Sequence, residues 1–164
     1  MVVAGIDELT SGRPPEELVL GNALRKARAV ADRVGDGHRV LGVDTDVALQ
    51  GRLLGKPETA DDARTLLTRL SGTTHEVLSG IAVVSPPDEE RTAVEATKVT
   101  FRTLSEDLLD AYVSSGEWRG RAGAYAVQGL GSMLVERVEG DLSNVIGLPL
   151  QRLFVLVPEI VGKP

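Results

Sequence analysis

The 164-residue sequence contains no cysteine, only two histidines and few aromatic residues (one Trp, two Tyr and two Phe). Without cysteine there is no disulfide framework, no thiolate zinc site and no cysteine nucleophile, and a cytoplasmic location is expected. Because aromatic residues make up only 3% of the chain, we expect no stacking platform for single-stranded nucleic acid. No run approaches the length of about 18 apolar residues that a membrane span needs, so no membrane partner is expected.

Positive charge is also in short supply, with 18 Lys and Arg against 24 Asp and Glu and a formal net charge of −6. Proteins that wrap a nucleic-acid duplex gain affinity by neutralising many phosphates with Lys and Arg, so we expect no nucleic-acid polymer as a partner. A small phosphorylated ligand is not excluded, and any nucleotide bound is expected to be a single one. The chain length favours one domain over residues 1–164.

Apolar periodicity and turn residues predict alternating helices and strands. The expected helices cover residues 14–34, 59–72, 105–115 and about 148–157, with Gly35 ending the first. The expected strands cover residues 39–44, 46–50, 74–84, 92–101, about 125–127 and 133–138. A turn cluster at 86–88 joins two of these strands into a long hairpin, and 129–131 reads as a turn. Strands interleaved with helices indicate an α/β or α+β domain.

The motifs of several common enzyme classes are missing. No Gly-x4-Gly-Lys-Ser/Thr loop, no complete Gly-x-Gly-x-x-Gly fingerprint and no Gly-x-Ser-x-Gly elbow occurs. His38 and His75 lack the spacing of zinc ligands. We expect His38 to face solvent and His75 to be a packed, hydrogen-bonded residue rather than a catalytic one.

A scattered set of polar residues remains, each beside Gly or Pro or near the end of an expected element. Its members are Glu8, Lys26, Asp44, Lys56, Arg121 and Gln128. Ligand chemistry often collects at such places, although each residue alone is equally well an ordinary exposed side chain. Asp44 is the strongest candidate, because an Asp after the apolar run 40–43 is disfavoured in a strand unless it caps, coordinates or catalyses.

Several motifs, in order along nearly the whole chain, resemble the Maf-like nucleoside triphosphate pyrophosphatases. They are Gly42-Val43-Asp44-Thr45, Leu54-Gly55-Lys56-Pro57, Leu70-Ser71-Gly72-Thr73-Thr74-His75-Glu76-Val77, Ala122-Gly123-Ala124-Tyr125-Ala126-Val127-Gln128-Gly129 and Ser143-Asn144-Val145-Ile146-Gly147-Leu148-Pro149-Leu150. The resemblance implies an α/β fold with a mixed twisted sheet, flanking helices and a central cleft, related to the inosine triphosphate pyrophosphatases. It also implies a homodimer, and hydrolysis of a nucleoside triphosphate to the monophosphate and pyrophosphate.

The same resemblance assigns roles to individual residues. Asp44 matches the family's catalytic acid, taken as the acceptor of a proton from water. Glu8 and Asp44 match residues expected to hold a divalent metal, Mg²⁺ or alternatively Mn²⁺. Lys26 and Lys56 match lysines expected to contact phosphates, and Arg121 stands where a lysine is usual, which keeps the charge but changes its reach. The chemistry is consistent, because phosphoanhydride cleavage needs a positioned water, a base and positive charge.

Thr45 and Gln128 match the positions that separate subgroups of the family. The subgroup acting on dTTP and UTP resembles this sequence in having Asp-Thr and Gln, whereas the subgroup acting on 7-methyl-GTP has Asp-Gln and Glu. A neutral Thr and Gln suit a pyrimidine edge, which offers a carbonyl and an N–H. The resemblance therefore implies a dTTP/UTP pyrophosphatase, with modified pyrimidine nucleotides as further substrates.

Two further departures from the family pattern bear on the site. No Ser-x-Ser-Pro-Arg-Arg-like loop precedes Met1, so we expect a misassigned start or a shortened chain, with exposed apolar surface and weaker phosphate binding. Asp46 replaces an apolar residue. On an extended backbone Asp44 and Asp46 point the same way, so that they share a metal or raise one another's pKa. Alternatively, the strand bends after Thr45 and Asp46 is solvated.

The competing function is a catalytically weak nucleotide-binding regulator linked to septum formation in cell division. The missing arginine loop motivates it, and turnover separates it from the enzyme. The 7-methyl-GTP specificity is a third alternative, disfavoured by Thr45 and Gln128.

Overall fold

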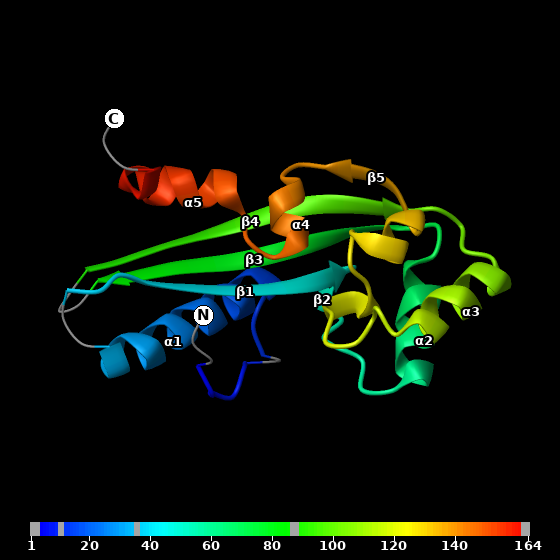
Figure 1. Ribbon diagram of the computed structural model, residues 1–164, viewed down its shortest axis with the longest axis horizontal. Helices are drawn as coiled ribbons and strands as arrows, with labels where there is room; N and C mark the ends of the chain where they lie inside the picture. Colours follow the sequence, from blue (N-terminus) through cyan, green and yellow to red (C-terminus); the bar gives the residue numbers. More distant parts are fainter. Residues whose placement is uncertain (1–3, 10–11, 35–36, 86–88, 162–164) are drawn as a thin grey trace.

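The protein is built on one antiparallel sheet with helices on both faces (Figure 1). The structure, a computed structural model, describes residues 4–9, 12–34, 37–85 and 89–161. Within these residues the strand order is β2-β1-β3-β4-β5, and every neighbouring pair is antiparallel. The strands are β1 (Val40–Leu49), β2 (Arg52–Leu53), β3 (Thr74–Ser85), β4 (Glu89–Phe101) and β5 (Val135–Glu139). The α/β class predicted from the sequence is confirmed, but the expectation of a mixed sheet was wrong, because all strand pairs among the described residues are antiparallel.

One face of the sheet is covered by the long helix α1 (Pro15–Val34), which lies along β1 and β3 (Figure 1). Two strand glycines allow this close approach. A Cβ atom on Gly42 would lie 2.3 Å from the carbonyl oxygen of Ala23, and one on Gly80 would lie 2.2 Å from that of Val19. Both distances are far below van der Waals contact, so any side chain at these glycines would push the helix off the sheet.

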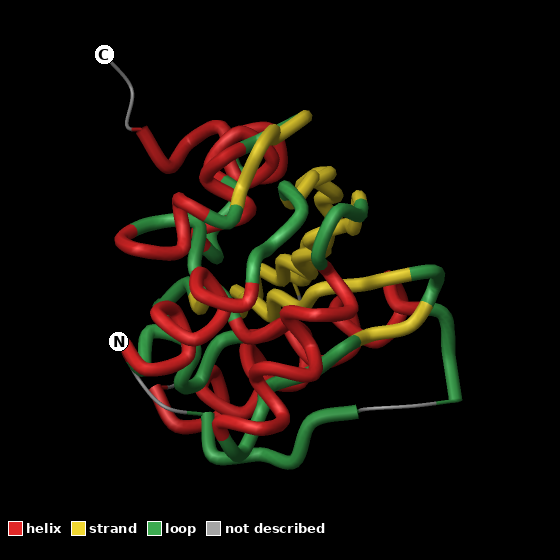
Figure 2. Tube along the Cα trace, turned by 90° about the vertical axis from the view of Figure 1, so that its right-hand side faces the viewer, coloured by secondary structure: helices red, strands yellow, loops and turns green. Residues whose placement is uncertain are grey.

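The opposite face is covered by the C-terminal helices α4 (Leu142–Ile146), α5 (Leu150–Leu156) and η3 (Pro158–Val161). Ile81 and Val83 of β3 pack against Leu153 and Val157 there. Seen from the end that carries the remaining helices, helical segments lie on both sides of the strands (Figure 2). The sheet is therefore the middle layer, and its two faces present different residues of the same strand to different helices.

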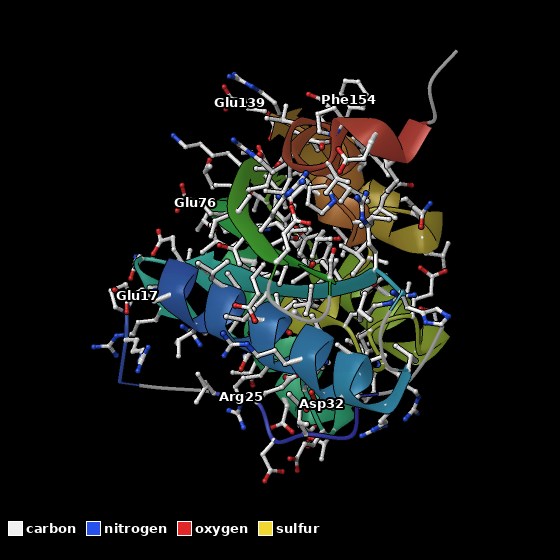
Figure 3. All side chains as sticks on the ribbon, turned by 90° about the vertical axis from the view of Figure 1, so that its left-hand side faces the viewer. Glu17, Arg25, Asp32, Glu76, Glu139 and Phe154 are labelled. Atoms are coloured by element: carbon white, nitrogen blue, oxygen red, sulfur yellow. The ribbon has the colours of Figure 1, made fainter. Side chains whose placement is uncertain are left out.

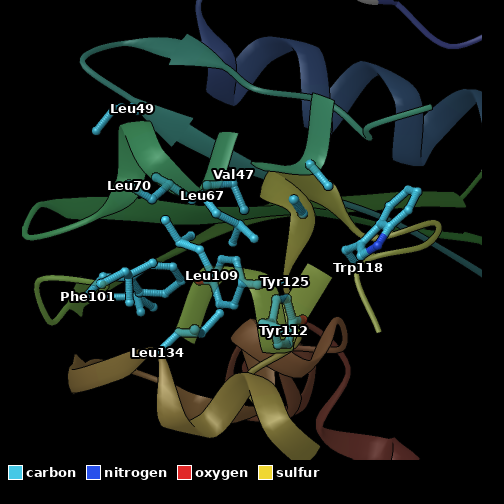
Figure 4. Packing of buried hydrophobic residues seen from close by; sticks show 14 of the residues in the cluster. Val47, Leu49, Leu67, Leu70, Phe101, Leu109, Tyr112, Trp118, Tyr125 and Leu134 are labelled. Atoms are coloured by element: carbon cyan, nitrogen blue, oxygen red, sulfur yellow. The ribbon is translucent and has the colours of Figure 1, made fainter. Parts of the chain in front are cut away.

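The largest core lies at one end of the sheet, where α2 (Ala60–Leu70) and α3 (Glu106–Ser115) pack around the ends of β3 and β4 (Figures 1 and 4). Leu67, Phe101 and Tyr112 are among its fully buried side chains. Thr59 caps α2 through the predicted capping box, in which its hydroxyl accepts from the N–H of Asp62 and the Asp62 carboxylate accepts in return.

The main helices and the long hairpin agree with the sequence predictions, but three expectations were wrong. The expected strands 39–44 and 46–50 form one continuous strand, β1, because β3 pairs with it from Val40 to Ala48. Residues 125–127 are not a strand but a loop, since no strand among the described residues pairs with them. Residues 129–133 form the 3₁₀ helix η2 (Gly129–Met133), so the strand expected at 133 begins at Val135. Gly35 and the 86–88 turn lie outside the described residues.

The outer edge of β1 is open along most of its length. Strand β2 pairs only with Ala48 and Leu49, and within the described residues no strand pairs with β1 on this side from Val40 to Asp46. A groove of about 690 Å³ runs beside the open edge, and Leu41 on its wall is 40% exposed. Across the described residues, no helix is both long and apolar enough to cross a membrane.

Candidate active site

A cleft of about 520 Å³ opens at the middle of the exposed edge of β1. It collects most of the polar residues singled out from the sequence, and these lining residues are Lys26, Asp44, Thr45, Lys56, Arg121 and Gln128. Glu8 lines a neighbouring cavity of about 340 Å³, which shares Asp44, Thr45 and Lys56 with the cleft. Both volumes fall in the range of about 300 to 1,000 Å³ that is usual for small-molecule sites.

The cleft wraps around the edge of β1, so the two faces of the strand contribute different chemistry. Asp44 points to the face covered by α1, where it meets Lys26. Thr45 points to the other face, where its hydroxyl lies 2.7 Å from that of Ser79 on β3. Asp44 was expected at the end of a strand but lies in the middle of one. An unpaired edge is what makes both residues accessible from a single cleft.

On the α1 face, two carboxylates meet one ammonium group. The Lys26 Nζ atom lies 2.5 Å from Asp44 Oδ1 and 2.5 Å from Glu8 Oε1. The hydrogen bond from Lys26 lowers the pKa of Glu8 more than partial burial raises it. Burial opposes the charge on Lys26, but hydrogen bonds to Asp44 and Glu8 outweigh burial and raise its pKa. The lysine is therefore charged at neutral pH, and its charge lies between the two carboxylates.

Lys56 and Arg121 come from two loops that are tied together at the mouth of the cleft. The backbone N–H of Gly123 donates to the carbonyl of Gly55 at 2.8 Å. Gly123 has a φ of 63° and no room for a side chain, because a Cβ would lie 2.8 Å from Val47. The tight turn at Gly123 thus lets the loop that carries Arg121 pack against β1. The hydrogen bond between Gly123 and Gly55 holds the loop that carries Lys56 beside the Arg121 loop.

Gln128 also lines the cleft, and it directly follows residues 125–127, which were expected to form a strand. Its side chain is exposed, and η2 begins directly after it. Glu117 fixes this loop, since its two carboxylate oxygens accept from the N–H groups of Leu130 and Gly131 at 3.2 and 3.3 Å. The lining of the cleft thus combines charged side chains (Lys26, Asp44, Lys56 and Arg121) with the neutral polar side chains of Thr45 and Gln128.

Sequence reasoning missed two buried polar residues behind the cleft, Asn22 on α1 and Ser79 on β3. Asn22 donates to Asp44 Oδ2 at 3.1 Å. A signal for Asn22 exists, because it lies one helical turn before Lys26 and interrupts the apolar stripe of α1. Ser79 carries no comparable signal, since a serine in an apolar strand reads as a solvent-facing position.

Asp46 points toward the same cavity as Asp44, as the extended backbone predicts. The strand does not bend after Thr45, so the alternative of a solvated Asp46 was wrong. Its Oδ1 accepts from the N–H groups of Val47 at 2.7 Å and Gly55 at 3.2 Å. Burial raises the pKa of Asp46 to about 6, and the nearby charge of Asp44 acts in the same direction.

This raised pKa predicts a pH-dependent effect of Asp46→Asn on stability. A carboxylate with a raised folded-state pKa contributes stability below its unfolded pKa and loses it as the pH rises through about 6. Relative to the variant, wild-type unfolding free energy should fall by about 2 kcal/mol between about pH 4 and about pH 8. Urea unfolding at both pH values measures this change. The exposed Asp107→Asn serves as the control, with an expected change below about 1 kcal/mol, and parallel pH curves for wild type and Asp46→Asn would contradict the prediction.

Both histidines lie as expected. His38 is exposed, and His75 is 2% exposed with its Nε2 2.8 Å from the Tyr125 hydroxyl. His75 also makes edge-on ring contacts with Phe101 and Tyr125, and burial lowers its pKa to about 4. His75 is therefore neutral near pH 7, and its contacts hold Tyr125, which precedes Gln128 by three residues. Tyr125 lies in the core among other buried side chains (Figure 4).

The described residues hold no group of three or more His, Asp or Glu side chains that could bind a metal ion. Two carboxylates, Glu8 and Asp44, nevertheless converge on one cationic group. Mg²⁺ is commonly held by one or two carboxylates together with substrate phosphates and water. The hard oxygen donors present here therefore suit such an ion once a phosphorylated ligand is bound.

The fold and this site define an α/β protein with a cleft that suits a small phosphorylated ligand. A family model described as "Maf-like protein" matches residues 1–160, and the chain belongs to this family. A protein of Bacillus cereus (strain G9842) named dTTP/UTP pyrophosphatase is 44% identical over 154 residues, which are 93% of this chain and 80% of the relative. Proteins of the same name from Bacillus cereus (strain B4264) and Bacillus anthracis are 43% identical over the same shares.

Proposed function

We propose that this protein is a nucleoside triphosphate pyrophosphatase that hydrolyses dTTP and UTP to the monophosphate and pyrophosphate. The observation that carries the proposal is the convergence of Asp44, three cationic side chains and the Thr45–Gln128 pair on one cleft. The relatives named dTTP/UTP pyrophosphatase, which match 93% of the chain, support the same activity. The reaction class is hydrolysis of the α–β phosphoanhydride bond.

Asp44 is the residue proposed to act on water. It is 8% exposed, lies in the wall of the cleft and is held through both carboxylate oxygens. In the proposed reaction it accepts a proton from the water that attacks the α-phosphorus, and pyrophosphate leaves. Lys26, Lys56 and Arg121 neutralise the negative charge that develops on the phosphate oxygens, which suits a reaction governed by positioning and electrostatics.

Glu8 and Asp44 are proposed to hold a divalent metal, Mg²⁺ or Mn²⁺, together with the substrate phosphates. The bound ion would supply positive charge to the phosphate oxygens. Because Lys26 lies between the same two carboxylates, its ammonium group must shift toward the phosphates when the ion binds. Bound nucleotide is therefore expected to raise the affinity of the protein for the metal, and bound metal to raise its affinity for the nucleotide.

Thr45 and Gln128, the neutral polar side chains that line the cleft, are proposed to recognise the pyrimidine. The Gln128 amide both donates and accepts hydrogen bonds, as does the Thr45 hydroxyl. Ser79 is 0% exposed, and its hydroxyl lies 2.7 Å from that of Thr45, which fixes the Thr45 side chain. A base that leaves these groups unpaired would bind and react less well.

Pyrophosphate release from dTTP, UTP and 7-methyl-GTP in the presence of Mg²⁺ tests the proposal. We expect monophosphate and pyrophosphate as products, with kcat/KM for the pyrimidine nucleotides at least about tenfold above that for 7-methyl-GTP. Separation of products by ion exchange distinguishes this reaction from release of the terminal phosphate. Saturable nucleotide binding without product would instead favour a regulatory binding protein, and preference for 7-methyl-GTP would overturn the pyrimidine assignment.

A further inference from the structure

Asn22 is a buried polar residue on the face of α1 that packs against the sheet. It is 3% exposed, and its neighbours along the same face, Val19 and Ala23, are fully buried apolar residues. Burying an amide among apolar groups costs free energy unless its hydrogen bonds are satisfied. The side chain therefore needs specific partners, and these partners indicate what the residue does.

All three hydrogen bonds of Asn22 lead toward the candidate active site. Its Oδ1 accepts from the N–H of Leu9 at 2.6 Å, and its Nδ2 donates to the Leu9 carbonyl at 3.0 Å. The same Nδ2 donates to Asp44 Oδ2 at 3.1 Å. Both N–H groups and the carbonyl oxygen are thus used, and a single side chain joins the backbone next to Glu8 to the carboxylate of Asp44.

Lys26 lies one helical turn after Asn22 and completes the arrangement. Lys26 contacts Asp44 Oδ1 and Glu8 Oε1, whereas Asn22 contacts Asp44 Oδ2 and the Leu9 backbone. Lys26 is only partly buried, and its flexible side chain must shift when a ligand enters. Asn22 is short, buried and fixed on the helix, so it is the contact that persists when the ammonium group moves.

We propose that Asn22 is a positioning residue that keeps the Asp44 carboxylate and the Glu8 segment in the arrangement required for metal binding and turnover. The inference rests on the proposed function, but it concerns a residue that touches neither substrate nor metal. Without Asn22, Asp44 keeps only its contact with Lys26 and is free to rotate. Leu9 loses both side-chain hydrogen bonds, and Glu8 is then held beside Asp44 only through the ammonium group of Lys26, which must shift when a ligand enters.

Asn22 has two contacts to test, its hydrogen bonds to the Leu9 backbone beside Glu8 and its hydrogen bond to Asp44. Two substitutions separate them. Asn22→Leu removes every hydrogen bond while keeping a side chain of similar size. Asn22→Asp keeps an acceptor for the Leu9 N–H but cannot donate to Asp44, and it places a second carboxylate beside it. Leu18→Ala is the matched control, because Leu18 is a buried residue of the same helix that lines none of the cavities around Asp44.

Hydrogen exchange at the Leu9 amide measures how firmly Asn22 holds the Leu9 backbone, and it does not depend on enzyme activity. Under native conditions, wild type, Leu18→Ala and Asn22→Asp are expected to protect this amide, whereas Asn22→Leu is expected to lose protection by at least about tenfold, since the Leu9 N–H then has no acceptor. Equal exchange in wild type and Asn22→Leu would overturn the proposed hold on the Glu8 segment.

The effect of Asn22 on Asp44 is measured in two ways: Mn²⁺ binding followed by electron paramagnetic resonance, and steady-state kinetics. Asn22→Leu is expected to bind Mn²⁺ about 10- to 100-fold more weakly, the usual effect of removing a residue that orients a metal ligand. Both Asn22 variants are expected to lose kcat by a similar factor, because neither can donate a hydrogen bond to Asp44. The KM for dTTP should change much less. Leu18→Ala should unfold more easily but keep the wild-type Mn²⁺ affinity and kcat.

Wild-type Mn²⁺ affinity in Asn22→Leu would overturn the inference, as would a loss of kcat that Leu18→Ala reproduces. Failure of the proposed function has a different signature, because the wild-type protein itself would then release no pyrophosphate. In that case the exchange and Mn²⁺ measurements still decide whether Asn22 organises the two carboxylates.

Discussion

Asp44→Asn is expected to lower kcat for pyrophosphate release from dTTP by about 10² to 10⁴-fold, the range associated with loss of a general base. The amide cannot accept a proton from water, yet it has nearly the same shape as the carboxylate. Asn22 and Lys26 both donate to Asp44, so the variant keeps at most one of these hydrogen bonds on its single amide oxygen. Stopped assays over a range of dTTP and Mg²⁺ concentrations measure the change.

Asp32→Asn is the control for this variant. Asp32 is an exposed residue of α1, on the side of the helix away from the sheet (Figure 3), so the substitution removes the same charge far from the cleft. We expect wild-type kinetics from it. A fall in kcat of less than about tenfold in Asp44→Asn, or a rise in KM alone, would show that Asp44 binds substrate and does not activate water.

The sequence predicted those elements whose local signals agree with their packing. Helix α2 has a capping box at Thr59, and the β3–β4 hairpin has long β-branched strands on either side of a turn cluster. In each case the residues that form the element also determine its limits. Their positions could therefore be read without knowing what packs against them.

The elements that were wrong depend on partners far away in the sequence. Tyr125 is buried among His75 and Phe101, so the residues around it look like an alternating strand, but no strand in the described part of the chain pairs with them. The strand end expected at Asp44 is absent because β3 pairs with β1 on both sides of it. Polar residues inside β1 suggested an end, whereas its open edge is what allows a polar strand centre.

For the candidate site too, the sequence predicted the residues but not their arrangement. Motifs that resemble a family singled out Lys26, Asp44, Thr45 and Lys56, and the structure brings them to one cleft. Their mutual geometry could not be read from the sequence, because it depends on how closely α1 approaches β1. That approach requires glycine at position 42 and brings Asn22 within hydrogen-bond distance of Asp44. Positioning residues such as Asn22 therefore cannot be identified until the packing of the helix against the strand is known.

Lys26→Met is expected to change turnover and metal binding in opposite directions. With the ammonium group removed, the phosphates lose a cationic partner, and kcat/KM for dTTP should fall by about 10² to 10³-fold. In the free protein, however, Glu8 and Asp44 lose the cation that lies 2.5 Å from each of them. A charge at such a distance is worth at least about 1 kcal/mol even in water, so Mn²⁺ should bind the nucleotide-free variant about fivefold or more tightly.

Arg25→Met tests whether these changes come from the position of Lys26 rather than from net charge. Arg25 precedes Lys26 on α1 but is exposed and points away from the sheet (Figure 3), so wild-type turnover and Mn²⁺ affinity are expected. If Lys26→Met lost turnover and also bound Mn²⁺ more weakly, the lysine would be required to organise the carboxylates and would not compete with the metal for them. Retained turnover would remove Lys26 from the phosphate-binding residues.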